Sequence, residues 1–147
     1  MSDRLFRAFS VVFLAGVLLH GVDHVRRGTD VVTTYVLGAG AVQFVFAVVA
    51  VALVFRSHRL APLSAVAIGI PGAVLFAAVH LLPHWGAFSD AFAGSHAGPG
   101  VSGLSWFSAL FEIAGDLAFG FAGLMMLRRR RVASAAPRVR EVSGSPA

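Results

Sequence analysis

The sequence predicts an all-α integral membrane protein, a four-helix transmembrane bundle with both chain ends in the cytoplasm. Three observations predict this class. The 147-residue chain is 57% hydrophobic and only 13% charged, whereas a soluble domain has about 25% charged residues. Its apolar residues form four runs, each close to the roughly 20 residues that cross a bilayer core. Its arginines gather at the ends of these runs.

The composition also excludes several kinds of function. All 12 basic residues are arginine, and cysteine is absent. Without cysteine there are no disulfides, thiolate metal ligands or dithiol redox chemistry. The sequence pI of about 11.5 does not indicate nucleic acid binding, because arginines at the ends of apolar segments set membrane orientation. We therefore expect the lipid bilayer as partner and no nucleic acid. A second copy of the chain or another membrane partner is left open.

The first expected span covers residues 5–25 and follows a short polar start. A tight connection leads to the second span, residues 31–55, with Thr29 or Asp30 as its helix N-cap. The third span covers residues 62–82. Each is long enough to cross the hydrocarbon core.

The rest of the chain contains one long loop, one span and a tail. The loop, residues 83–103, is rich in glycine and aromatic residues and includes His96. Loops of this length are usually functional or disordered. The fourth span covers residues 104–127, so the membrane domain is expected to be residues 1–131. Residues 132–147, rich in Ala, Ser, Pro and Arg, read as a disordered cytoplasmic tail.

The arginines predict the orientation of the bundle. With a cytoplasmic N-terminus, only Arg26 and Arg27 lie outside. Eight arginines then lie inside: Arg4, Arg7, Arg56, Arg59 and Arg128 to Arg131. This bias follows the positive-inside rule. We therefore expect a multi-pass protein of the cell membrane whose long loop faces outward.

Polar pairs at helical spacing interrupt three of the four apolar runs. In the first, His20 and His24 are four residues apart with Asp23 beside them, so all three share a helix face. The third contains His80, and we expect His84 to lie on the same helix face. The fourth contains a pair of carboxylates.

Depth along the helices brings these pairs together. With a rise of about 1.5 Å per residue, Glu112 lies about 10 Å and Asp116 about 17 Å below the outer surface. The histidines occupy the outer ends of their spans, and Gln43 lies near the depth of Asp116. Ionisable groups inside a span are costly and turn away from lipid. Two carboxylates one turn apart repel unless one is protonated or a cation lies between them.

A metal ion would satisfy these groups, since imidazole and carboxylate bind zinc, iron or copper, and bundle interiors are suited to such sites. The candidate ligands are His20, Asp23, His24, His80, His84, Glu112 and Asp116. A redox, hydrolytic or metal-handling role would follow, with no catalytic residue assigned. A bis-histidine haem, for instance between His20 and His80, is a variant of this hypothesis.

Two other classes of function remain open. Histidines and acids in a chain are also typical of a proton-coupled carrier or a proton relay. The same groups could instead lock the helices of a structural or partner-binding subunit. Small residues, Gly38, Gly40, Gly120 and Gly123, leave room for helix association in either case.

The first quarter of the chain carries a resemblance. Arg7 followed by an apolar run to His20-Gly21 loosely resembles the opening of DoxX-like four-helix membrane proteins. The resemblance implies a similar four-span layout. It implies no function.

Overall fold

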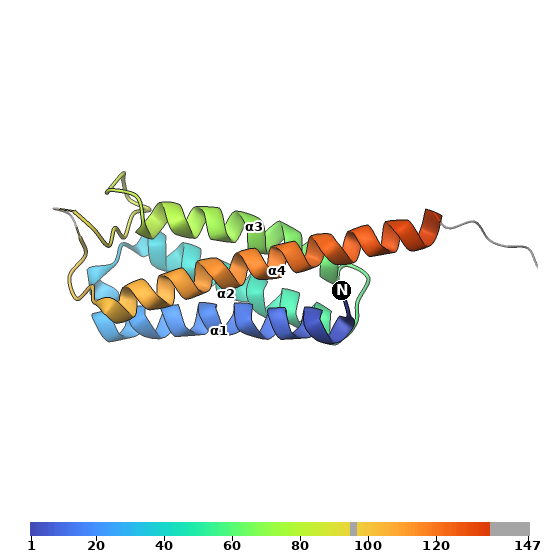
Figure 1. Ribbon diagram of the computed structural model, residues 1–147. Helices are drawn as coiled ribbons and strands as arrows, with labels where there is room; N and C mark the ends of the chain where they lie inside the picture. The colour runs from blue at the N-terminus through green and yellow to red at the C-terminus, as the bar shows by residue number, and fades with distance from the viewer. Residues whose placement is uncertain (95–96, 136–147) are drawn as a thin grey trace, which may run out of the picture.

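The computed structural model describes residues 1–94 and 97–135 and is all-α in this part of the chain (Figure 1). The elements in chain order are α1 (Asp3–Arg27), the 3-10 turn η1 (Thr29–Val31), α2 (Thr34–Phe55), α3 (Ala61–His80) and α4 (Gly103–Ala135). Each of the four α-helices is long and apolar enough to cross a membrane. The predicted all-α class with four such helices is confirmed.

The helices alternate in direction, so the two ends of the bundle differ (Figure 1). The loop end contains residues 81–94 and 97–102 and the connection between α1 and α2. The arginine end contains residue 1, the turn between α2 and α3, and the end of α4. There Arg130 Nη1 donates to the Arg59 carbonyl at 2.7 Å. Arginines from distant parts of the sequence therefore gather at one end.

Two helix boundaries differ from the sequence prediction at the loop end. α2 begins at Thr34, and its N-cap is Thr33, whose side chain accepts from the Val36 amide at 3.3 Å. α3 ends at His80, two residues before the predicted end of its span. Pro83 explains the early end, because a residue before proline avoids helical geometry.

The fourth helix is longer than predicted. α4 continues through the arginine run to Ala135, so residues 132–135 are helical and do not belong to the expected tail. Arginine and alanine are strong helix formers, which accounts for the extension. Residues 136–147 of the expected tail lie outside the described residues.

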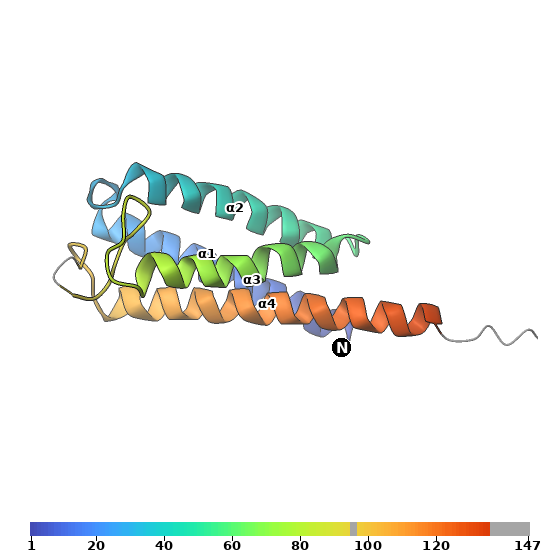
Figure 2. The same ribbon diagram turned by 90° about the horizontal axis from the view of Figure 1, so that it is seen from above.

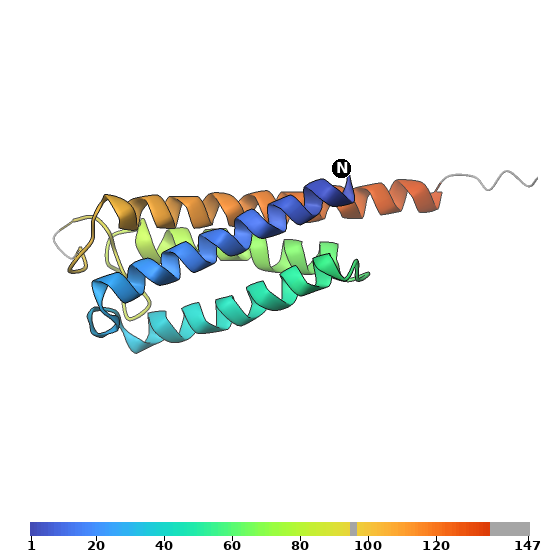
Figure 3. The same ribbon diagram turned by 90° about the horizontal axis from the view of Figure 1, so that it is seen from below.

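α4 packs closely against both α1 and α3 because glycines line the contacts. A Cβ added to Gly16 would lie 2.8 Å from the Glu112 Cα, and one on Gly69 would lie 2.8 Å from the Gly120 nitrogen. Real Cβ atoms do not come so close. Small residues thus allow backbone contact between these helices, as in other membrane bundles. Figure 3 shows α1 crossing in front of α3 and α4.

The interior toward the arginine end is aromatic and closely filled. The Phe119 ring stacks on Phe13 at 4.8 Å and on Phe6 at 5.8 Å between ring centroids. All three side chains are buried. This cluster fixes α1 against α4.

α2 is packed unevenly along its length. Its buried residues are Val36 and a group between Ala47 and Val54, near the arginine end. Toward the loop end α2 diverges from α3 (Figure 2). A Cβ on Gly38 or Gly40 would meet nothing within 4 Å, so these glycines do not mediate helix packing within the described bundle.

Candidate metal centre

Three imidazoles from two helices meet inside the loop end of the bundle. His20 and His24 come from adjacent turns of α1, and His80 is the last residue of α3. His20 is 3% exposed and His80 1% exposed. One ligand nitrogen from each ring lies within 4.8 Å of the others. We call these three side chains the histidine cluster.

The closest pair of nitrogens in the cluster needs only a small adjustment for coordination. His20 Nε2 and His24 Nε2 are 2.8 Å apart and hydrogen-bonded. Two imidazole nitrogens on one tetrahedral zinc, each at about 2.05 Å, are about 3.3 Å apart. The pair must therefore open by roughly half an ångström, which a rotation of the rings supplies.

The hydrogen-bond network assigns the proton on His20. Ser108 donates its hydroxyl proton to the Ser105 carbonyl at 3.0 Å, so its oxygen accepts from His20 Nδ1 at 3.3 Å. The lone pair of His20 is then on Nε2. His24 donates to that lone pair through its own Nε2.

Asp90 contacts the other two imidazoles from the loop. Its backbone carbonyl accepts from His80 Nδ1 at 3.1 Å, and its Oδ2 lies 3.5 Å from the same nitrogen. Oδ2 is also 4.0 Å from His24 Nδ1, a buried nitrogen that has no hydrogen-bond partner among the described residues. Every Nδ1 of the cluster thus faces an oxygen of Ser108 or Asp90, and the Nε2 atoms of His20 and His24 face each other.

Arg27 holds the Asp90 carboxylate in place. Its Nη1 donates to Oδ2 at 2.7 Å and its Nη2 to Oδ1 at 2.8 Å, a bidentate geometry that is the strongest form of this pair. The Arg27 side chain is fully buried and that of Asp90 is 4% exposed. The loop is also fixed to α3, because the amides of Asp90 and Phe92 donate to the Val79 and His80 carbonyls, each at 3.0 Å.

Asp23, a predicted ligand, has another partner. Its Oδ1 accepts from Arg26 Nε at 2.9 Å, and the side chain does not belong to the histidine cluster. Arg26 in turn donates to the Gly100 carbonyl and to Ser105 Oγ. In the described structure Asp23 therefore orients an arginine that fixes the loop against α4.

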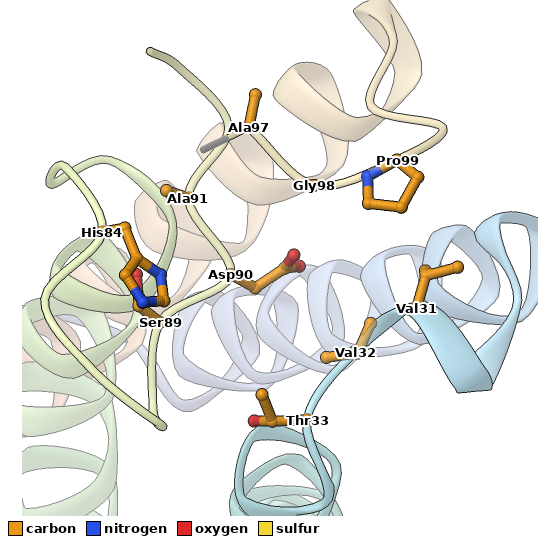
Figure 4. A pocket seen from close by; sticks show the side chains of 10 residues that line it. All are labelled: Val31, Val32, Thr33, His84, Ser89, Asp90, Ala91, Ala97, Gly98 and Pro99. Atoms are coloured by element: carbon orange, nitrogen blue, oxygen red, sulfur yellow. The ribbon is translucent and has the colours of Figure 1, made fainter. Parts of the chain in front are cut away.

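His84, also predicted as a ligand, does not share a helix face with His80. That prediction was wrong because α3 ends at His80 and the chain turns at Pro83. Figure 4 shows His84 with Ser89 and Asp90 around a cavity of about 280 Å³ at the loop end. Asp90 lies between this cavity and the histidine cluster. His96, named in the sequence analysis, lies outside the described residues.

Glu112 and Asp116 are buried as expected but do not belong to the histidine cluster. Glu112 Oε2 and both carboxylate oxygens of Asp116 lack a hydrogen-bond partner within the described residues. At Gly72 a Cβ would lie 2.8 Å from Asp116 Oδ2 and 2.9 Å from Gln43 Nε2. The acids and the amide thus form a second polar group, which lies deeper in the bundle.

A porphyrin does not fit between His20 and His80. Their ring centroids are 4.7 Å apart, and both rings have further aromatic contacts. Phe76 packs on His20 at 4.6 Å and Phe92 on His80 at 4.6 Å. The spacing of these two rings therefore excludes a haem plane between them.

Comparison of the chain with protein-family models, with curated proteins and with solved structures finds no match. The resemblance to DoxX-like proteins therefore stays a resemblance of the first span. The site must be interpreted from its own residues.

Sequence reasoning did not assign Asp90 and Arg27 to the site. One signal was present, since Asp90 is a carboxylate in the long loop, ten residues after His80. Nothing local in the sequence pairs that loop with the end of α1.

Proposed function

We propose that the protein binds a divalent transition metal through His20, His24 and His80, in the half of the bundle that the arginine bias assigns to the outside of the membrane. One observation supports this most strongly. The Nδ1 atoms face Ser108 or Asp90, while one ligand nitrogen from each ring lies within 4.8 Å of the others. Metal-binding histidines almost always direct their second nitrogen to such an acceptor.

The type of ligand limits which metals the site can bind. Three imidazoles without thiolates suit zinc, copper or iron more than calcium or magnesium. Metal binding would replace the proton between the Nε2 atoms of His20 and His24. That proton would move to His24 Nδ1, toward Asp90 Oδ2, which supplies the partner that this nitrogen lacks in the metal-free network.

Three protein ligands favour a reactive or exchanging site over a purely structural one. Structural zinc sites are closed by four protein ligands, whereas catalytic sites keep a position for water or substrate. The roles open to such a centre are redox chemistry, hydrolysis or metal handling. Glu112 lies deeper on the neighbouring helix and would act on bound water or substrate.

A proton relay is less well supported. The unpaired oxygens of Glu112 and Asp116 favour it, but a relay must continue to the other side of the membrane. Toward the arginine end the interior is filled by the stacked rings of Phe6, Phe13 and Phe119. Among the described residues, Ser10 is the one buried polar side chain at the level of this cluster, and its hydroxyl already donates to the Arg7 carbonyl.

Metal content of the purified protein tests the proposal. The wild type, stripped with a chelator and reloaded with zinc, should retain about one ion per chain. His20→Gln and His80→Gln should lose it, because each removes one of three ligands. His58→Gln is the matched control, since His58 is in the exposed turn at the arginine end. Equal zinc retention in all four proteins would overturn the proposal.

A further inference from the structure

A large apolar pocket opens beside the histidine cluster. It encloses about 1130 Å³ between α1, α2 and α3, at the end where α2 diverges from α3 (Figure 2). Its outer wall consists of side chains such as Leu18, Val22 and Phe44. This volume exceeds that of most small-molecule sites, which are lined mainly by apolar residues with a few polar groups.

The inner wall of the pocket is polar. Gln43 and Glu112 line it, together with all three imidazoles of the histidine cluster. Glu112 is 2% exposed, yet its Oε2 has no hydrogen-bond partner in the described structure. Gln43 Nε2 is likewise buried and unpartnered there. Buried polar atoms left unpaired are unfavourable and are normally satisfied by a partner.

These two atoms define the chemistry of the missing partner. An amide nitrogen donates a hydrogen bond and a carboxylate oxygen accepts one. A hydroxyl group does both, whereas an acyl chain of the bilayer does neither. The lining is otherwise mostly apolar and suits a hydrophobic body, and the helices that form it are apolar enough to cross a membrane, where such a molecule would be dissolved.

We infer that the pocket binds a lipid-soluble molecule whose apolar body carries a hydroxyl head group, with that head group between Gln43 and Glu112. The imidazoles on the same wall would bring the bound metal to the head group. This second step rests on the proposed metal function. Binding in the pocket does not, because neither Gln43 nor Glu112 belongs to the histidine cluster.

Gly40 provides a way to fill the pocket without disturbing the fold. It lines the pocket, and a Cβ there would meet no atom within 4 Å. Gly40→Leu should therefore occupy the ligand volume. Gly103→Leu is the matched control, because a Cβ on Gly103 is also unobstructed and this residue does not line the pocket.

The test uses the full chain in lipid nanodiscs and two photoreactive probes. One is a long-chain alcohol with a diazirine, and the other is the same chain without the hydroxyl. We expect the alcohol to label α1 and α2 at the pocket saturably. Gln43→Leu should weaken this labelling about tenfold, the scale of one hydrogen bond. Gly40→Leu should also weaken it, because its side chain occupies the pocket, and Gly103→Leu should leave it unchanged.

Equal, non-saturable labelling by both probes would overturn the inference, because it would mean that bilayer chains fill the pocket. So would saturable labelling that Gly40→Leu does not reduce. Zinc content is measured on the same samples. Zinc bound without saturable labelling refutes the pocket alone, and saturable labelling without zinc refutes the metal site alone.

Discussion

At the arginine end the bundle interior is filled by stacked phenylalanine rings, whereas at the loop end it contains three imidazoles, unpaired polar atoms and a large apolar pocket. The same four helices form both ends. The difference arises because α2 packs mainly near the arginine end and diverges from α3 toward the loop end. One end is therefore closely packed, and the other contains the histidine cluster and an open pocket.

The loop end compensates for its weaker packing with two ion pairs, of which one is buried. The pair between Arg27 and Asp90 links α1 to the loop that covers the histidine cluster. Asp23 and Arg26 form a second link toward α4. Polar contacts thus hold the loop and helices together at the loop end, as aromatic packing holds the helices together at the arginine end.

The largest expected effect is from breaking the buried pair. Arg27→Leu leaves the Asp90 carboxylate buried without its cation, which should lower the free energy of unfolding by about 3–5 kcal/mol. Denaturant unfolding in detergent measures this. Arg27→Leu combined with Asp90→Leu should recover most of the loss, because no unpaired charge remains. A loss below about 1 kcal/mol in the single variant would show that the pair does not stabilise the loop end.

A cavity at the arginine end should destabilise the protein without affecting the site. Phe119→Ala removes the ring that joins Phe6 and Phe13, at a cost of about 3 kcal/mol. Zinc content should stay at the wild-type level, because the ring does not touch the histidine cluster. Loss of zinc in a still-folded Phe119→Ala protein would contradict the separation of the two ends.

The contact between His20 Nδ1 and Ser108 offers a more subtle test of the metal site. Ser108→Ala removes its acceptor, and such changes around a metal site weaken affinity about 10- to 100-fold. A zinc competition titration measures the effect. Ser10→Ala is the control, since Ser10 is a buried serine of α1 whose hydroxyl donates to the Arg7 carbonyl. Equal zinc affinities of the Ser108→Ala and Ser10→Ala variants would show that the Nδ1 contacts do not support metal binding.

The smallest expected effect is from Gly40→Leu, which is compared with Gly120→Leu. Gly120→Leu should destabilise the fold strongly, because a Cβ there would lie 2.7 Å from Ile70 Cγ1. Gly40→Leu should change the free energy of unfolding by less than about 0.5 kcal/mol, as is usual away from packed features. Thermal unfolding of both variants compares the closed and open parts of the bundle. Similar losses would mean that α2 is packed along its whole length.

The sequence was informative where the signal is local. Hydropathy located the four helices, and the spacing of His20 and His24 placed them on one face. The depth estimate brought His80 to the same level, and the structure confirms that these three lie together. Burial of Glu112 and Asp116 followed from the cost of acids in a span.

The sequence was uninformative where the site depends on the loop. Asp90 reaches the cluster only because the loop folds back on the end of α3 and pairs with Arg27. His84 was assigned to a helix that stops at His80. The pairing of Asp23 with Arg26, three residues along the same helix, could have been anticipated from helical spacing.

An X-ray absorption spectrum of zinc bound to the purified wild-type protein tests the central claim most directly. The account predicts about three imidazole nitrogens at about 2.0–2.1 Å, with one or more remaining positions filled by water or an added ligand. A spectrum with oxygen ligands alone and no imidazole scattering would contradict it, because the metal would then not lie among His20, His24 and His80.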